Sequence, residues 1–151
     1  MHERREVPLF ELKADDGHPS GTLAAWQRRD MLVALLHPGC DVCHALHRSL
    51  QEHAPGLRTQ EAEAMTVVPR GGAGEPVPPG ALVDAEGRAS RALAEAFGGE
   101  GRLGVASRFG GLYAVVDIHS GATRRVLDEA LEWLDLAQRQ CGECQAPLAW
   151  D

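Results

Sequence analysis

Two cysteines separated by two residues follow an apolar segment, and their side chains could carry thiol chemistry. Cys40 and Cys43 lie in HPGCDVCHALH, directly after residues 31–36 (MLVALL), which have the pattern of a strand buried on both faces. A helix is expected to begin at Cys40 or Asp41. Cys40 would then lie where free backbone amides and the helix dipole stabilise a thiolate. Cys43, one turn later on the same side, could resolve a mixed disulfide. The spacing predicts a redox pair, with Cys40 as the nucleophile and Cys43 as the resolving cysteine.

Polar side chains beside this pair are candidate supporting residues. A protonated His37 would hold the thiolate form, whereas His44, on the first helical turn, is poorly placed to carry positive charge. Asp41 suits the first turn but repels a neighbouring thiolate, so we expect Cys40 to be less acidified than its place at the helix N-terminus alone would make it. His37, His44 and His47 are otherwise expected to be exposed or on the helix surface.

Other functions fit the motif CDVCH less well. CDVCH is also the c-type haem attachment motif, but haem attachment normally needs an exported protein and a helical setting. Two inert, buried thiols are the plainest alternative. No cofactor or metal ion is expected beyond a redox-active disulfide.

A second pair, Cys141 and Cys144, follows the last predicted helix in CGEC. A helix of about fourteen residues covers roughly 21 Å, so we expect this pair near the opposite pole from Cys40, too far to share a zinc ion or a disulfide within one subunit. A local disulfide or thiol pair that pins the tail, a second redox pair, and half of a zinc site shared between subunits remain alternatives.

The hydrophobic pattern predicts alternating strands and helices. Residues 7–30 form an N-terminal extension with a short strand and a helix capped by Thr22; 31–36 and 64–69 are buried strands. The first helix should stop at Pro55 and Gly56. ALVD (81–84) is a short strand, 88–98 a helix, 112–118 and TRRVL (123–127) a hairpin, and Asp128 caps the last helix. This order predicts an α/β sandwich with a mixed sheet, as one domain over 1–151 with a tail at 142–151.

Strand–CxxC–helix, followed by strand, helix, hairpin and a final helix, resembles the thioredoxin fold. VPLFELKADDGHPSGTLAAW and ALVDAEGRASRALAEAFG further resemble segments of its redoxin branch, which includes peroxiredoxins and membrane-anchored thiol-disulfide oxidoreductases. The resemblance implies a three-layer sandwich whose mixed central sheet is flanked by helices, and disulfide exchange as the activity.

The sequence departs from that pattern at two places. Thioredoxins place a cis-proline just before the strand that faces the CxxC, and SRFGGLYAVVD has none, so Gly110 or Gly111 is expected to replace it. Peroxiredoxins need P-x-x-x-[ST]-x-x-C, but the serine or threonine position holds His37 before Cys40 and Cys40 before Cys43. A thiol-dependent peroxidase is therefore the second alternative, and a non-enzymatic binding module with a zinc or structural role for CGEC the third.

Composition limits the partners. A formal charge of -7 argues against nucleic acid. No segment approaches the roughly 20 apolar residues that span a bilayer, and the first residues lack the apolar core of a secretory signal, so the expected compartment is the cytoplasm. The expected partner is a protein or small-molecule thiol or disulfide, with a thioredoxin-reductase-type enzyme as a candidate electron donor. No pattern in the sequence sets an oligomeric state.

Overall fold

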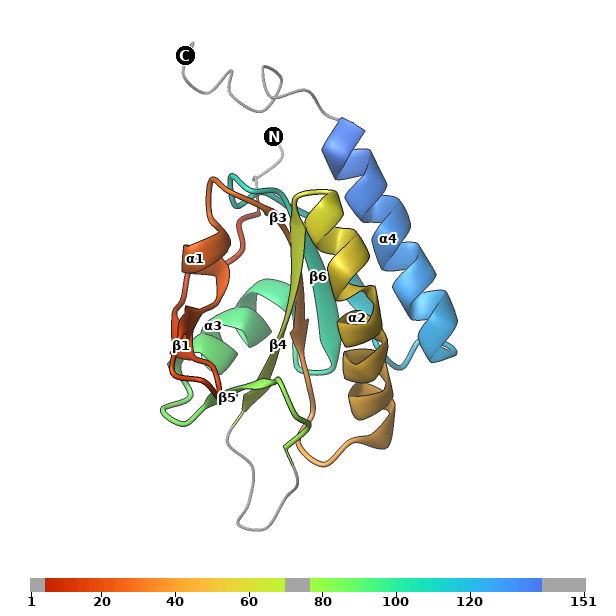
Figure 1. The fold of residues 1–151 in the computed structure, drawn as a ribbon. Coiled ribbons are helices and arrows are strands. Elements are labelled where there is room, and N and C mark those ends of the chain that lie inside the picture. The colour runs from red at the N-terminus through yellow and green to blue at the C-terminus, as the bar shows by residue number, and fades with distance from the viewer. Residues whose placement is uncertain (1–4, 70–76, 140–151) are drawn as a thin grey trace.

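A five-stranded mixed sheet with helices on both faces forms the body of the molecule (Figure 1). The computed structural model describes residues 5–69 and 77–139. The elements in chain order are β1 (Leu12–Lys13), β2 (Pro19–Ser20), α1 (Thr22–Ala25), β3 (Asp30–Leu35), α2 (Asp41–Thr59), β4 (Ala62–Pro69), β5 (Leu82–Asp84), α3 (Arg88–Phe97), β6 (Arg102–Ala106), β7 (Leu112–Asp117) and α4 (Thr123–Arg139). The α/β sandwich with a mixed sheet is confirmed.

The strand order places β3 at the centre of the sheet, as β5-β4-β3-β6-β7. β3 runs parallel to β4 and antiparallel to β6, and β7 runs antiparallel to β6. The carboxyl ends of β3 and β7 therefore lie at the same pole, as does the start of α2 (Figure 1).

Alternate residues of β3 enter two separate cores, which explains its continuous apolar sequence. Leu32, Ala34 and Leu36 pack into the core covered by α2 and α4. Met31 and Val33 point the other way, into the core that α3 and the N-terminal segment cover. The predicted strand at 31–36 is confirmed, and its burial on both faces fixes the position of whatever follows it.

The predicted hairpin was wrong in its strands. The hairpin pairs β6 with β7, and residues 123–127 (TRRVL) form the first turns of α4 rather than a strand. Val126 begins the buried stripe that continues through Ala130 and Leu134, so tertiary packing favours the helix. Asp128 lies inside α4 and does not cap it.

β6 was missed because Gly104 interrupts its apolar pattern. A Cβ atom at Gly104 would lie 2.4 Å from Cζ of Phe97, so the glycine makes room for the ring that α3 packs against the strand. An internal glycine in a strand often marks such a close approach.

Two smaller helix predictions were also wrong. α2 continues through Pro55 to Thr59, because Leu57, buried in the core with only 3% of its surface exposed, holds the last turn against the sheet. Thr22 does not cap α1; its hydroxyl donates to the carbonyl of Pro8 at 2.6 Å and accepts the amide of Phe10 at 2.9 Å. Through these two hydrogen bonds, Thr22 joins the start of α1 to the segment around Pro8 and Phe10 within the N-terminal extension.

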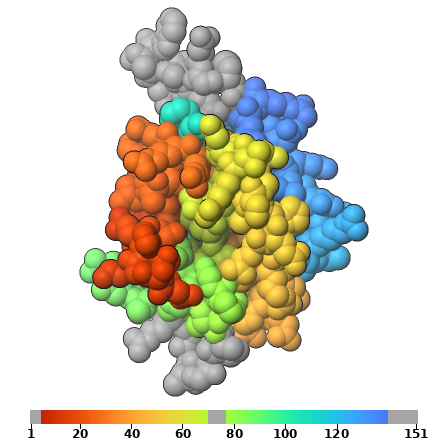
Figure 2. Space-filling model, in the orientation of Figure 1, coloured from red at the N-terminus to blue at the C-terminus, as the bar shows by residue number. Residues whose placement is uncertain are grey.

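The N-terminal extension lies beside the edge strand of the sheet. β1 contacts β5, and in Figure 2 the red and orange N-terminal residues lie against the green residues around that strand. Nearby, the imidazole of His47 is buried, with Nδ1 2.8 Å from the Thr66 hydroxyl and Nε2 donating to the carbonyl of Pro79 at 2.7 Å. The expectation of an exposed His47 was wrong, since this side chain joins α2, β4 and the loop before β5.

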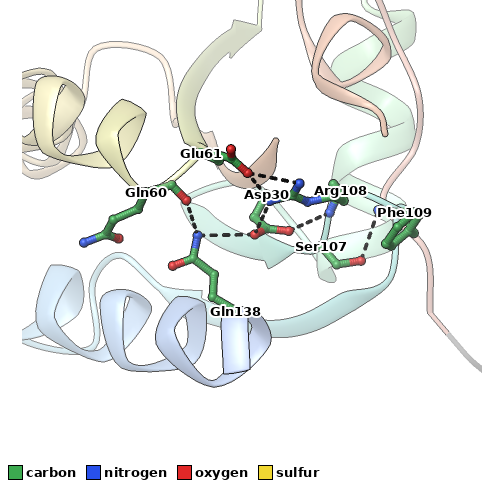
Figure 3. A network of polar contacts seen from close by, with 7 residues as sticks. All are labelled: Asp30, Gln60, Glu61, Ser107, Arg108, Phe109 and Gln138. Atoms are coloured by element: carbon green, nitrogen blue, oxygen red, sulfur yellow. Dashed lines mark hydrogen bonds and ion pairs between the residues drawn. The ribbon is translucent and has the colours of Figure 1, made fainter. Parts of the chain in front are cut away.

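A polar network joins four elements at the pole opposite the cysteines (Figure 3). The buried Asp30 accepts the amide of Arg108 at 2.9 Å and an amide N–H of Gln138 at 3.3 Å. The Arg108 guanidinium lies 3.5 Å from Asp30 and 3.3 Å from Glu61. Because the carboxylate is buried with several donors, it anchors α4 and the β6–β7 turn to the start of β3.

Candidate active site

Cys40 is the N-cap residue of α2, as the sequence predicted. Its backbone is extended, with φ -96° and ψ 117°, and its Sγ accepts the amide of Cys43 at 3.3 Å. Gly39, at φ +66°, makes the turn that brings the chain from β3 into the helix. The sulfur therefore lies against a free first-turn amide and at the positive end of the helix dipole.

Cys43 lies one turn further along α2 and faces the core. Its side chain is fully buried, whereas Cys40 is partly exposed. Its Sγ accepts the backbone amide of His37 at 3.4 Å. One thiol is thus open to a substrate and the other is hidden behind it.

His119 completes the site and was missed in the sequence. Its Nε2 lies 3.2 Å from the Cys40 sulfur. The residue lies in the turn after β7, where Asp117 Oδ1 accepts its backbone amide at 2.8 Å and lies 3.8 Å from its Nδ1. Asp117 therefore holds both the backbone and the ring of His119 at the pole where the cysteines lie.

A second imidazole, that of His37, lies beside the ring of His119, and both rings lie close to Gly101. The ring centroids are 5.3 Å apart, and His37 Nδ1 lies 3.5 Å from Glu100 Oε1. A Cβ atom at Gly101 would lie 2.5 Å from two atoms of the His37 ring and 3.2 Å from Cε1 of His119. Both imidazoles thus occupy the space that a side chain at position 101 would need.

This geometry corrects the expected substitute for the cis-proline. The antiparallel neighbour of β3 is β6, and the residue just before β6 is Gly101, whose amide donates to the carbonyl of Leu35 at 2.8 Å. Gly110 lies in the β6–β7 turn at the far pole, where its carbonyl accepts the amide of Val7. Neither Gly110 nor Gly111 takes the proline position.

The pKa values of the two thiols depart from that of an ordinary cysteine in opposite directions. Burial raises the pKa of Cys40, but hydrogen bonds from the Cys43 thiol and amide, together with His119, outweigh it, so that the net pKa is lowered. Burial, together with the hydrogen bond and the charge of the neighbouring Cys40, raises the pKa of Cys43 to about 12. Cys40 is therefore the sulfur that carries the thiolate.

The other predicted supporting residues lie apart from the thiols. Asp41 is exposed on the first turn of α2, where its charge suits the helix dipole. His44 is half-buried one residue after Cys43, and among the described residues no hydrogen bond joins its ring to either sulfur. The structure gathers Cys40, Cys43, His37 and His119 instead.

Cys141 and Cys144 lie outside the described residues, so their role stays a prediction. The helix before them does run as expected. α4 begins just after the turn that carries His119 and ends where Gln138 contacts Asp30, at the pole away from Cys40.

No protein-family model and no curated protein matches the chain. A thiol:disulfide interchange protein of the thioredoxin family from Chlorobium tepidum is similar in structure, with a TM-score of 0.64, 14% identity and coverage of 91% of this chain and 99% of that one. The peroxidoxin BcpB from Mycobacterium tuberculosis gives 0.63 at 15% identity over 89% and 98% of the two chains. An exposed lipoprotein thioredoxin from Streptococcus pneumoniae gives 0.58 at 21% identity over 83% and 99%.

Within the described residues, no helix has the length and apolarity that a bilayer crossing needs. The sheet order, the CxxC at the start of the helix after the central strand, and these structural neighbours agree. The chain has the thioredoxin-like fold that the sequence predicted.

Proposed function

We propose that this protein is a thiol-disulfide oxidoreductase that exchanges disulfides with a protein or small-molecule thiol partner through Cys40 and Cys43. One observation carries the proposal. The partly exposed Cys40 sulfur accepts the Cys43 amide at the start of α2 and lies 3.2 Å from His119 Nε2, with Cys43 hidden directly behind it. This arrangement offers an accessible thiolate for attack and a buried second thiol that can resolve the mixed disulfide.

In the first step the Cys40 thiolate attacks one sulfur of a substrate disulfide. A Cys40–substrate disulfide forms, and the other substrate sulfur leaves as a thiolate that takes the Nε2 proton of His119. His119 supports this step, because a protonated Nε2 donates a hydrogen bond to the Cys40 thiolate and stabilises it before attack.

In the second step Cys43 attacks the Cys40 sulfur and releases the remaining substrate thiolate. The charge of Cys40 disappears once it is bonded to the substrate, so part of the cause that raises the pKa of Cys43 is removed at that moment. A ring nitrogen of His119 lies within 4.8 Å of both sulfurs, and Nε2, which has lost its proton in the first step, is placed to accept the Cys43 proton. The protein ends as the Cys40–Cys43 disulfide, and two electrons have passed to the substrate.

The neighbours of the cysteines favour exchange over peroxide reduction. A peroxidase of the peroxiredoxin type would need a threonine or serine hydroxyl three residues before its nucleophile, and His37 stands there.

The proposed compartment is the cytoplasm, where paired cysteines are more often catalytic than structural, and a thioredoxin-reductase-type enzyme is the proposed electron donor. The fold itself does not select a compartment, since one structural neighbour is an exposed lipoprotein.

The test is reduction of insulin disulfides with dithiothreitol as the electron source. We expect the wild-type protein and a Cys141→Ser/Cys144→Ser double variant to accelerate the reaction, and Cys40→Ser to lose the acceleration. Acceleration that survives in Cys40→Ser would refute the assignment. Hydrogen peroxide consumption that depends on Cys40, without insulin reduction, would replace the proposal by a peroxidase.

A further inference from the structure

The reduced site presents three soft donor atoms to one point in space. Sγ of Cys40, Sγ of Cys43 and a ring nitrogen of His119 all lie within 4.8 Å of one another. Over residues 5–69 and 77–139 no other three cysteine, histidine or carboxylate ligands come as close. Two thiolates and an imidazole form a donor set typical of zinc.

The spacing of these donors is close to what a zinc ion requires. With Zn–S near 2.3 Å and Zn–N near 2.0 Å, the 3.2 Å between Cys40 Sγ and His119 Nε2 would subtend about 96° at the ion. Tetrahedral ligands at those bond lengths lie about 3.5–3.8 Å apart. Side-chain movements of about an ångström would therefore bring all three donor atoms onto one ion.

The surroundings of the donors support a metal as well. His119 turns Nε2 toward the sulfurs and Nδ1 toward the Asp117 carboxylate, 3.8 Å away. A carboxylate behind a ligating histidine orients the ring and raises its basicity. Backbone amides of Cys43 and His37 donate to the two sulfurs and would offset the charge of a dithiolate.

We propose that the reduced protein binds one Zn²⁺ through Cys40, Cys43 and His119, with water in the fourth position. Cys40 and His119 are both partly exposed, so an ion can enter from solvent. A site with three protein ligands keeps an exchangeable position, unlike a closed structural zinc site. This proposal concerns the same thiols as the exchange reaction but does not depend on that reaction.

Zinc and disulfide formation would exclude each other. Oxidation of the zinc-bound pair by a disulfide joins the two sulfurs, passes two electrons to the oxidant with two protons from solvent, and releases Zn²⁺. A reduced protein that holds zinc would be shielded from alkylation and premature oxidation, and its entry into the exchange cycle would depend on the free zinc concentration.

The experiment is a zinc titration of the protein reduced with a phosphine, in competition with a chromophoric chelator. We expect one zinc per chain in the wild type, at least about 100-fold weaker binding in Cys40→Ser and in His119→Ala, and unchanged binding in His53→Ala, which alters an exposed residue of α2. The Cys141→Ser/Cys144→Ser double variant should keep the ion. Circular dichroism confirms that each variant is folded.

A second readout separates this site from chance binding to thiols. Addition of diamide should release one zinc for each disulfide formed, and Asp117→Asn should weaken zinc binding about 10–100-fold without removing any ligand. Zinc that is lost with Cys141 and Cys144 but kept in Cys40→Ser would overturn the proposal, as would the absence of a stoichiometric ion in the reduced wild type. Insulin reduction, measured without zinc, reports on the exchange activity independently.

Discussion

Gly101→Ala tests whether the two imidazoles and the glycine form one packed unit with the nucleophile. The new Cβ atom would lie 2.5 Å from Cδ2 and Nε2 of His37 and 3.2 Å from Cε1 of His119. The first separation is closer than any unstrained contact, so the His37 ring must move, and the second is tight enough that the His119 ring must shift by a few tenths of an ångström. Such a shift lengthens the 3.2 Å contact between His119 Nε2 and the Cys40 sulfur.

The variant has two costs, and a matched control separates them. An alanine at φ +71° carries a backbone strain of about 1–2 kcal/mol. Gly17→Ala imposes a similar strain at φ +86°, in a turn where the added Cβ meets no atom within 4 Å. Gly17→Ala should therefore lose about 1–2 kcal/mol of stability in urea denaturation. Gly101→Ala should lose at least as much, because the clash with the His37 ring adds to the strain, and only Gly101→Ala should disturb the site.

The reactivity of Cys40 gives the decisive comparison. A hydrogen bond to a charged group is worth about 1.5 kcal/mol or more, which corresponds to roughly a tenfold change in the thiolate population or rate. We expect iodoacetamide at neutral pH to alkylate Cys40 about tenfold more slowly in Gly101→Ala, and at the wild-type rate in Gly17→Ala. Equal rates in all three proteins would refute the claim that position 101 holds the imidazoles against the thiol.

Three further substitutions test other parts of the account. Cys43→Ser should accumulate a Cys40–substrate mixed disulfide, visible by mass spectrometry, because the resolving thiol is gone; rapid turnover without that adduct would contradict its role. Asp30→Ala should lose about 3 kcal/mol in urea denaturation, since it leaves a guanidinium and an amide without their buried acceptor, whereas Glu61→Ala, which removes an exposed partner, should lose less than about 1 kcal/mol. Leu57→Ala should lose about 2–5 kcal/mol; a loss below 1 kcal/mol would mean that this leucine does not hold the last turn of α2.

The region around the first cysteine pair could be predicted because each local signal agrees with the next. An apolar strand, a glycine turn and a helix with its cysteine at the N-cap require no distant contact to be identified. The continuous burial of β3 and the position of Cys40 on α2 were both read from about 20 neighbouring residues.

The hairpin and the start of α4 were harder because tertiary packing decides them. Gly104 looks like a loop residue until Phe97 is seen against it. Residues 123–127 have strand-like composition, but they form a helix because Val126 and Leu127 face the core. Local propensity is overridden where a distant surface sets the burial.

His119 could have been found from topology alone. A strand that runs antiparallel to a strand antiparallel to β3 must end at the pole where β3 ends, so the turn after β7 faces the cysteines. A histidine two residues beyond the strand, after Asp117, was the available signal. What sequence could not supply was the 3.2 Å contact, because it depends on the register of three strands.

The most direct test of the account is a time course of alkylation of the fully reduced protein, with each cysteine followed by peptide mapping across a range of pH. We predict that Cys40 reacts first and that its rate levels off below the pH range of an ordinary thiol, because its pKa is lowered. Cys43 should stay protected, with a rate still rising toward pH 12, because burial and the neighbouring Cys40 raise its pKa to about 12. Reaction of Cys43 as fast as Cys40, or an ordinary thiol profile for Cys40, would contradict the assignment of nucleophile and resolving cysteine.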